Sequence, residues 1–308
     1  MRIFFPLIAI IIFASCSKPK EAATVTEAAP EPETNSFAGK PLFAKPVDSI
    51  SQSKSDSAIA AIKSKGELTE EDYIEISRQL LAVNHFKKAV ENFSEGIEKY
   101  PNSFKLLRHR GHRYLNLRQP DKAIVDLNKA EELIRTQPEV WEYDGTGKPT
   151  ATYQHQIWYH IGLYHYLKRN YTESATAYEK SLAYTKEGNN IAGASDWLYN
   201  AYQRSGQKDK IAGLLKPFTL DFNIENKDYP YFRRLLLFNG VIKPEELVDE
   251  AKPIGEMTLL EVTKLYGLAN WYRYNGNTEK ANELYKKVLE SKEWPGFAYA
   301  CAELDVIQ

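Results

Sequence analysis

The sequence contains little cysteine and almost no excess of either charge. Only Cys16 and Cys301 occur among its 308 residues, so a disulfide-stabilised scaffold is not expected. The 40 basic and 41 acidic residues nearly cancel, whereas nucleic-acid-binding proteins usually carry a basic excess. The apolar stretch near the start, Ile3 to Ala14, is shorter than the roughly 20 residues that a membrane-spanning helix needs.

Motifs of common enzyme classes are also missing. The sequence has no G-x-S-x-G nucleophile motif, no H-E-x-x-H or C-x-x-C metal spacing and no glycine-rich nucleotide fingerprint. The segment YDGTGKPT is similar to a phosphate-binding loop, but Glu142 stands where its first glycine belongs, and Pro149 replaces the magnesium-binding hydroxyl. We therefore expect a protein that is not an enzyme, with no cofactor and no metal site.

The first 36 residues differ in composition from the rest of the chain. Arg2 precedes an apolar stretch that ends in Phe13, Ala14, Ser15 and Cys16, as in a secretion signal. This ending resembles the lipobox of bacterial lipoproteins, with Phe13 where leucine is usual. The resemblance implies lipidation of Cys16, the alternatives being a plain secreted protein or an uncleaved anchor. Residues 17–36 lack aromatic residues and predict a flexible tether.

From residue 69 onward the sequence repeats itself. Ala123 follows Ala89 by 34 positions in a matching helical pattern, and Gly111 follows Ser77 by the same distance. Small residues at such fixed offsets let two helices approach closely while bulky side chains fill the seam. Further copies begin near Ile157 and in the strings SDWLYNAYQRSG and LYGLANWYRYNG, and an insertion separates the second copy from the third.

These units resemble tetratricopeptide repeats, which are helix–turn–helix units of 34 residues. The resemblance implies an all-α, right-handed superhelical solenoid of about six helical hairpins. Two positions depart from the pattern, because Arg169 stands where the turn glycine is usual and Tyr199 where a small residue is usual. The expected segments are a signal peptide at 1–15, a tether from Cys16 at 16–36, an N-terminal extension with a short helix at 37–68, repeats 1–2 at 69–136, an inter-repeat loop at 137–154, repeats 3–6 at 155–295 with the fourth and fifth degenerate, and a cap helix at 296–308.

The resemblance also implies a concave groove, lined by the first helix of each hairpin, that holds a peptide. Arginine binds carboxylates in a bidentate manner and tyrosine gives rigid contact area, so these residue types suit such a groove. The asparagine-plus-lysine set of the chaperone carboxylate clamp is absent. The residues expected on the groove face are Arg78, Arg108, His112, Tyr159, Tyr166, Asn200, Tyr266, Asn270 and Arg273.

Five of the six histidines lie between His109 and His165. His109 and His112 share a helix face, but a zinc site needs three or four converging ligands, so we expect groove or core histidines instead. A metal-binding protein or a hydrolase built on this region is the least favoured alternative.

These observations predict a non-catalytic scaffold, lipid-anchored in the bacterial cell envelope at the outer membrane, that binds a protein or peptide partner and no nucleic acid. The alternative is a lipoprotein that binds carbohydrate or cell wall, because sugars stack on aromatic rings. The aromatic residues behind this alternative are Trp158, Tyr159, Tyr164, Tyr166, Trp271 and Tyr272.

Overall fold

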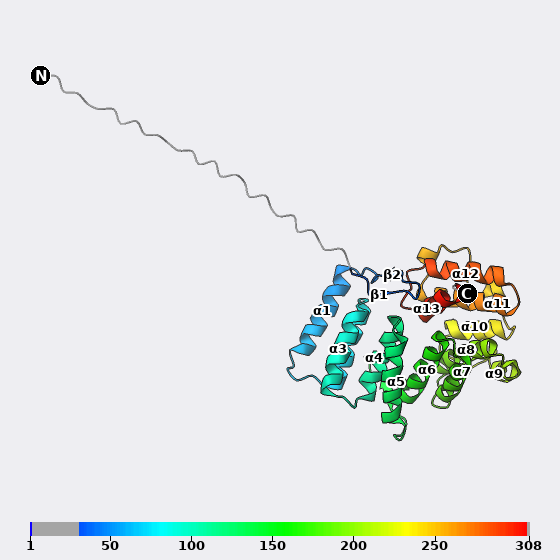
Figure 1. Ribbon diagram of the computed structural model, residues 1–308, viewed down its shortest axis with the longest axis horizontal. Helices are drawn as coiled ribbons and strands as arrows, with labels where there is room; N and C mark the ends of the chain where they lie inside the picture. The colour runs from blue at the N-terminus through cyan, green and yellow to red at the C-terminus, as the bar shows by residue number, and fades with distance from the viewer. Residues whose placement is uncertain (2–30, 307–308) are drawn as a thin grey trace. The chain divides into compact units, whose positions relative to one another are not determined.

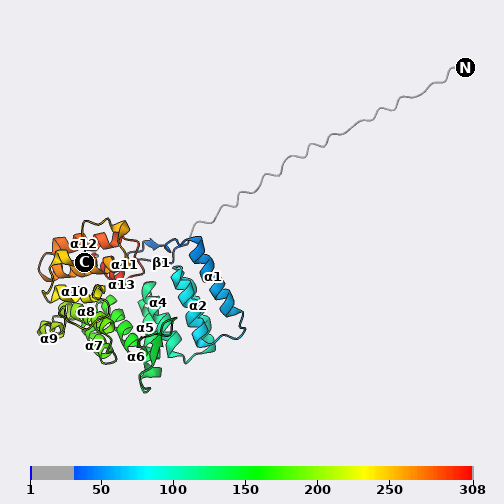
Figure 2. The ribbon, with the colours of Figure 1, turned by 180° about the vertical axis from the view of Figure 1, so that it is seen from behind.

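The computed structural model describes residue 1 and residues 31–306 of the chain. The predicted signal peptide, Cys16 and most of the predicted tether lie outside these residues. Within them, the structure contains thirteen α-helices, three short 3₁₀ turns and two small antiparallel strand pairs (Figures 1 and 2). The prediction of an all-α fold is therefore confirmed. No helix in this part of the chain is long and apolar enough to cross a membrane.

The helices follow one another as antiparallel hairpins along the chain. Before the first hairpin come β1 (Thr34–Asn35), β2 (Pro41–Leu42) and α1 (Ser49–Lys63). The first three hairpins are α2 (Glu70–Ala82) with α3 (Phe86–Lys99), α4 (Phe104–Asn116) with α5 (Pro120–Ile134), and α6 (Tyr153–Leu167) with α7 (Tyr171–Leu182). Between α5 and α6 the chain forms β3 (Trp141–Tyr143) and β4 (Pro149–Thr152).

The later hairpins are less regular. Helix α8 (Gly188–Ser205) is followed by the short α9 (Ile211–Leu215), and α10 (Pro230–Phe238) by a 3₁₀ turn at Pro244–Glu246. The last hairpin again has two full helices, α11 (Leu259–Tyr274) and α12 (Thr278–Glu290), and α13 (Phe297–Val306) follows it. The degenerate fourth and fifth repeats of the sequence thus correspond to hairpins with a shortened second helix.

Small residues bring the two helices of a hairpin together, as their periodicity predicts. A side chain at Gly111 would meet Leu127 at 2.9 Å, and one at Gly162 would meet Tyr178 at the same distance. Ala89 and Ala123 are fully buried. Bulky side chains at these positions would push the helices apart, so the hairpin seam depends on them.

The turns inside the hairpins use left-handed backbone at equivalent positions. Asn84, Arg118 and Arg169 have φ values of 61°, 58° and 61°, and Gly206 and Gly276 take the same role in later hairpins. Arg169 thus adopts the conformation of the glycine that it replaces, at a cost of roughly 1 kcal/mol. The second departure from the repeat pattern, Tyr199, is buried and stacks on Phe238 with ring centroids 4.2 Å apart.

Two sequence predictions differ from the structure around the ends of the array. Residues 33–36 belong to the predicted tether, yet the Glu33 carboxylate accepts from the Lys87 backbone amide at 2.7 Å and Thr34 donates to the Leu117 carbonyl. Their own backbone groups pair in the β1–β2 ladder. The folded part therefore begins before Phe37, because these residues find partners on the hairpins.

The C-terminal helix α13 does not cap an exposed end, which corrects the second prediction. It packs against α11 and α12 and also reaches α6, and its Glu303 accepts from the backbone amide of Phe37, which lies between β1 and β2. Seven of its ten residues are buried, including Ala300, Cys301 and Ala302. A cap helix would keep one polar face in water, whereas α13 is enclosed by the hairpins.

Candidate functional site

Five of the nine residues predicted to line an open groove are buried inside the protein. Arg108 is 5% exposed and Tyr166 is 3% exposed. Asn200, Tyr266 and Asn270 are fully buried. Because their side chains are buried, these five residues do not form an open peptide groove.

Three of these residues belong to an internal polar network. Asn270 donates to the Asn200 side-chain oxygen at 2.9 Å and accepts from the Tyr285 hydroxyl at 2.6 Å. Tyr266 donates to the Asp305 carboxylate at 3.0 Å. Buried polar groups of this kind are costly to separate from their partners, so the network fixes α8, α11, α12 and α13 to one another.

Two carboxylates of α13 form ion pairs with arginines of the hairpins. The Glu303 carboxylate accepts from Arg118 Nη2 at 2.8 Å and from the Phe37 backbone amide at 3.0 Å. Asp305 pairs with Arg204 at 2.8 Å and with the predicted groove residue Arg273 at 3.4 Å. The arginine–carboxylate pairs that we expected between the groove and a partner therefore form within the chain.

The inter-repeat insertion covers the two arginines that were predicted to line the groove in the first two hairpins. The Arg108 guanidinium pairs with Glu142 of β3 at 3.0 Å, and both side chains are nearly buried. Arg78, the other arginine predicted for the groove, is more exposed and donates to the Tyr143 carbonyl at 2.8 Å. The insertion is thus the ordered hairpin β3–β4 rather than an irregular loop.

The two remaining predicted residues, His112 and Tyr159, line a cavity that is still open. Its volume is about 250 Å³. Helices α4, α6 and α8, the start of α10 and the start of α13 supply its walls. We call it the His–Tyr pocket and define it by His112, His155, Tyr159, His160, Asn189, Tyr229, Tyr231 and Phe297.

Hydrogen bonds fix the tautomers of the three pocket histidines. His160 Nδ1 lies 2.6 Å from the Gln156 carbonyl, which can only accept, so this nitrogen carries the proton. His155 Nδ1 contacts the Ser181 carbonyl at 3.1 Å and donates in the same way. In both rings Nε2 is left as an acceptor without a partner among the described residues.

His112 has the opposite tautomer. Its Nδ1 contacts Arg113 Nη2, and a guanidinium can only donate, so His112 Nε2 carries the proton. The His112 and His160 rings lie face to face at a tilt of 38°, with centroids 4.1 Å apart. The pocket therefore offers one imidazole donor and two imidazole acceptors.

Burial keeps these histidines neutral. It lowers the pKa of His112 and of His160 well below the usual value, and the charges of Arg113 and Arg108 act in the same direction. Burial also lowers the pKa of His155 to about 4. Arg113 has no carboxylate within ion-pair distance in the part of the chain described, so it adds positive potential beside the pocket.

A second cavity of about 450 Å³ continues from the His–Tyr pocket. Asn189 and Asn190 line both spaces. Lys148 of the β3–β4 turn and Glu225 of the following loop line the outer cavity and form an exposed ion pair at 3.0 Å. We call the two cavities together the open cleft, because Asn189 and Asn190 line both of them.

Gly188 shapes one wall of the open cleft. A Cβ atom at this position would lie 2.2 Å from the Asn223 carbonyl oxygen. Only glycine permits this approach of the 223–225 loop to the first turn of α8. Asn189 follows directly, makes no side-chain hydrogen bond within the described residues and has a buried, unpartnered amide oxygen.

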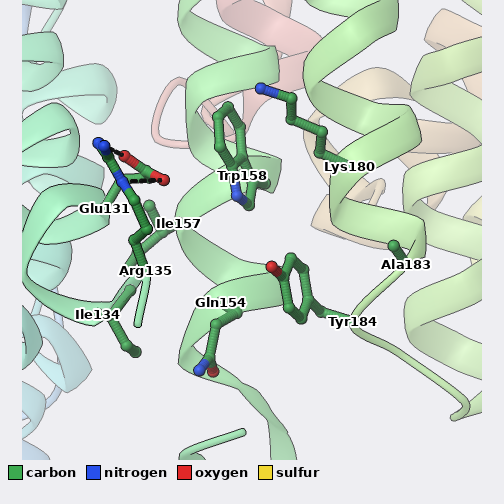
Figure 3. A pocket seen from close by; sticks show the side chains of 9 residues that line it. All are labelled: Glu131, Ile134, Arg135, Gln154, Ile157, Trp158, Lys180, Ala183 and Tyr184. Atoms are coloured by element: carbon green, nitrogen blue, oxygen red, sulfur yellow. Dashed lines mark hydrogen bonds and ion pairs between the residues drawn. The ribbon is translucent and has the colours of Figure 1, made fainter. Parts of the chain in front are cut away.

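A further cavity, of about 310 Å³, is lined by residues of α5, α6 and α7. Figure 3 shows Trp158 beside Lys180, with Tyr184 and Gln154 below them. The Lys180 ammonium lies 4.0 Å from the Trp158 ring centroid, and the Glu131–Arg135 pair borders the space. Trp158, one of the residues behind the carbohydrate alternative, thus has a cation on one face.

The other aromatic residues of the carbohydrate alternative pack within the protein. Tyr166 packs edge-on against Trp197 with centroids 5.1 Å apart, and Trp271 and Tyr272 contact each other at 5.1 Å. Tyr164 and Tyr159 are partly buried against the core. Only Tyr159 of this group reaches the His–Tyr pocket.

The histidine cluster does not form a metal centre in the described residues. No three His, Cys, Asp or Glu side chains are arranged there to hold an ion. His155 contacts the Ser181 hydroxyl at 2.9 Å, but Ser181 is fully buried and donates to the His155 carbonyl. Cys301 is also buried, and burial raises the pKa of its thiol. These groups are poorly placed as nucleophiles.

Sequence reasoning missed Asn189, Tyr229 and Tyr231. The tyrosines lie in the degenerate fifth repeat, where the repeat template gives no register, and Asn189 lies in the first turn of α8. The string EGNNIAG, with a glycine before two amides at a helix start, was the one local signal.

Comparison with known proteins gives solved structures only. No family model matches the chain, and no curated protein sequence matches it. A tetratricopeptide repeat protein from Parabacteroides merdae is 14% identical, over 82% of this chain and 94% of that one, with a TM-score of 0.49.

Two further structures have comparable similarity. PilW, described as a type IV pilus biogenesis factor, is 14% identical over 79% of this chain and 94% of its own, with a TM-score of 0.43. YrrB, described as a tetratricopeptide protein with an unusual peptide-binding site, is 20% identical over 66% and 93%, with a TM-score of 0.36.

Proposed function

We propose that this protein is a non-catalytic scaffold that holds a segment of a protein partner in the open cleft. The observation that carries the proposal is the cleft itself. The rest of the predicted groove is filled by α13 and the β3–β4 hairpin, while two connected cavities of about 450 and 250 Å³ are left open. Pockets of this combined size are typical of ligand sites.

The residues along the cleft suit a peptide. The Asn189 carboxamide makes no side-chain hydrogen bond in the described residues, and a carboxamide can donate and accept at once, as a peptide group requires. Asn190 donates to the Thr150 carbonyl at 2.8 Å and so ties α8 to the β3–β4 hairpin. The exposed Lys148–Glu225 pair contributes only about 0–1 kcal/mol and can open at little cost.

We further propose that lipidation of Cys16 anchors this scaffold at the outer membrane of a bacterial cell envelope. The support is the lipobox-like ending of the signal sequence, followed by residues without aromatic side chains. Metabolic labelling with an alkyne-tagged fatty acid should mark the wild-type chain and leave Cys16→Ser unlabelled. Equal labelling of both chains would remove this part of the proposal.

Site-specific photocrosslinking tests the scaffold function directly. A photoreactive amino acid at Lys186, which lines the open cleft, should crosslink to a discrete partner segment in envelope membranes. The matched control is the same amino acid at Lys129, which is exposed on α5. A partner crosslinked at position 186 and absent at 129 supports the proposal. The same background at both positions, or crosslinks only to glycan, contradicts it.

A further inference from the structure

We infer that the His–Tyr pocket selects a tyrosine side chain of the bound segment, and this inference rests on the proposed function. The pocket lies at the inner end of the open cleft, joined to the outer cavity through Asn189 and Asn190. A peptide lying along the cleft would therefore insert one side chain into it.

Two hydrogen-bond acceptors of the pocket lack partners among the described residues. His155 Nε2 and His160 Nε2 are both acceptors, because backbone carbonyls hold the proton on Nδ1 of each ring. A side chain that enters must displace water from these nitrogens. Unless it brings a donor of its own, it leaves polar groups unpaired, which costs about 1–3 kcal/mol for each group.

The walls of the pocket suit an aromatic ring. Tyr159, Tyr229, Tyr231 and Phe297 line it, and Tyr229 and Tyr231 pack edge-on to one another at 5.5 Å. Ring pairs in offset or edge-on geometry add about 0.5–1.5 kcal/mol beyond the area that they bury. An inserted ring therefore gains contact with the walls while its polar tip reaches the imidazoles.

Charged side chains are disfavoured by the same surroundings. The pocket already resists a proton on His160, because burial and the Arg108 charge lower its pKa. An ammonium or guanidinium group would meet this potential as well. A carboxylate or a phosphate dianion has no proton to donate to His155 Nε2 or His160 Nε2, so it would leave both acceptors unpaired. A neutral aromatic side chain with a hydroxyl places a ring against the walls, brings a donor for the imidazoles and carries no charge.

Phenylalanine has the same ring as tyrosine but lacks the donor. Sites built to hydrogen-bond a hydroxyl reject the analogue that lacks it, because their own polar groups are left unpaired. We expect a phenylalanine peptide to bind at least about tenfold more weakly than the tyrosine peptide. A phosphotyrosine or lysine peptide should bind more weakly still.

Binding of synthetic peptides to the full chain tests the inference. The probes are blocked pentapeptides Gly-Ser-X-Ser-Gly with X as tyrosine, phenylalanine, phosphotyrosine or lysine, followed by saturation-transfer NMR. N-acetylglucosamine is a separate probe. The variants are His160→Phe, which keeps a ring and removes the acceptor, and Asn189→Ala at the junction. Asn128→Ala, on the exposed surface of α5, is the matched control.

The tyrosine peptide should bind best to wild type and to Asn128→Ala. The tyrosine-to-phenylalanine ratio should fall toward one in His160→Phe, and Asn189→Ala should weaken both peptides. Equal binding of the two peptides to wild type, or binding of the sugar alone, would overturn the inference. If position 186 still crosslinks a protein, the scaffold function survives that failure. If it crosslinks none, both proposals fail.

Discussion

Arg118 and Glu303 form an ion pair at 2.8 Å between side chains that are 3% and 4% exposed. The arginine is the left-handed turn residue between α4 and α5, and the glutamate lies 185 positions later in α13. Arg169, the next turn residue of this kind, donates to the Leu304 carbonyl at 2.7 Å. Arginines thus replace the usual glycine at two turns that face α13.

Arg118→Ala should strongly destabilise the protein. It leaves the Glu303 carboxylate buried with one backbone donor, and removal of one partner of a buried pair costs about 3–5 kcal/mol. Urea unfolding followed by circular dichroism measures the change. Arg135→Ala, which removes an exposed i,i+4 pair with Glu131, is the control and should change stability by under about 1 kcal/mol. Similar losses in the two variants would contradict the role of the buried pair.

Gly267→Ala should disturb a second buried ion pair. A Cβ atom at Gly267 would lie 2.4 Å from Arg234 Cγ, and Arg234 pairs with Asp196 at 2.8 Å with both side chains fully buried. The arginine cannot move without leaving its partner, so we expect a loss of about 2–4 kcal/mol in thermal unfolding. Gly213→Ala in α9, where nothing lies within 4 Å, should be neutral or slightly stabilising.

The stability that His155 contributes should fall as the pH drops from about 6.5 toward 4. Burial lowers the pKa of His155 to about 4, from 6.5 in the unfolded chain. Between these values the unfolded state binds more protons, so the free energy of unfolding decreases as pH falls, by about 1.4 kcal/mol per pH unit for this group. The full contribution is present above pH 6.5.

The buried Asp196 acts in the opposite direction. Burial raises its pKa to about 7, although Arg234 opposes the shift, so the folded state binds its proton more readily. Asp196 contributes equally to wild type and to His155→Asn, so its contribution cancels in the difference between their stabilities. Between pH 6.5 and 4, wild type should lose stability relative to the variant as the pH falls, and parallel curves would show that His155 does not contribute.

Reversal of charge at the two predicted groove arginines should have unequal effects. Arg108→Glu places a second carboxylate beside Glu142 in a nearly buried site, so the β3–β4 hairpin should detach and stability should fall by about 3 kcal/mol or more. Arg78→Glu removes one bond to the Tyr143 carbonyl at a more exposed position and should cost about 1 kcal/mol. Hydrogen exchange of residues 141–152 and urea unfolding distinguish the two, and equal effects would contradict the burial of Arg108.

Gly188→Ala should open the cleft without unfolding the hairpins. The added methyl group displaces the Asn223 carbonyl and with it the 223–225 loop, which forms a wall of the outer cavity. We expect faster hydrogen exchange in residues 220–228 and loss of photocrosslinking at position 186. Gly213→Ala should leave both unchanged. Retained crosslinking in Gly188→Ala would show that this wall does not contribute to binding.

The helical hairpins were predictable because their signal is local and repeated. Small residues such as Gly111 and Ala123 recur with the period of the hairpin, and the structure places them where two helices meet. The left-handed turns also keep this period, since Asn84 and Arg118 are 34 positions apart. The residues that determine each hairpin therefore lie within its own repeat.

The candidate site was less predictable because segments far along the chain complete it. His112 and Tyr159, which were predicted for the groove, line the His–Tyr pocket, but Tyr229 at the start of α10 and Phe297 of α13 line it too. The composition of α13 indicates that this helix is buried, which the groove and cap predictions did not take into account. FAYACAELDV is apolar on nearly all sides, and such a helix is buried rather than left at an end.

The position of α13 has a consequence for how the chain reaches its native state. A linear repeat array can fold from any unit and spread outward, since each unit touches only its neighbours. Here the Phe37 amide bonds to Glu303 across 266 positions, so an early segment of the array completes its contacts only when a much later one is in place. The array should therefore unfold as one cooperative unit, and loss of α13 should loosen β1, β2 and the turn at Arg118.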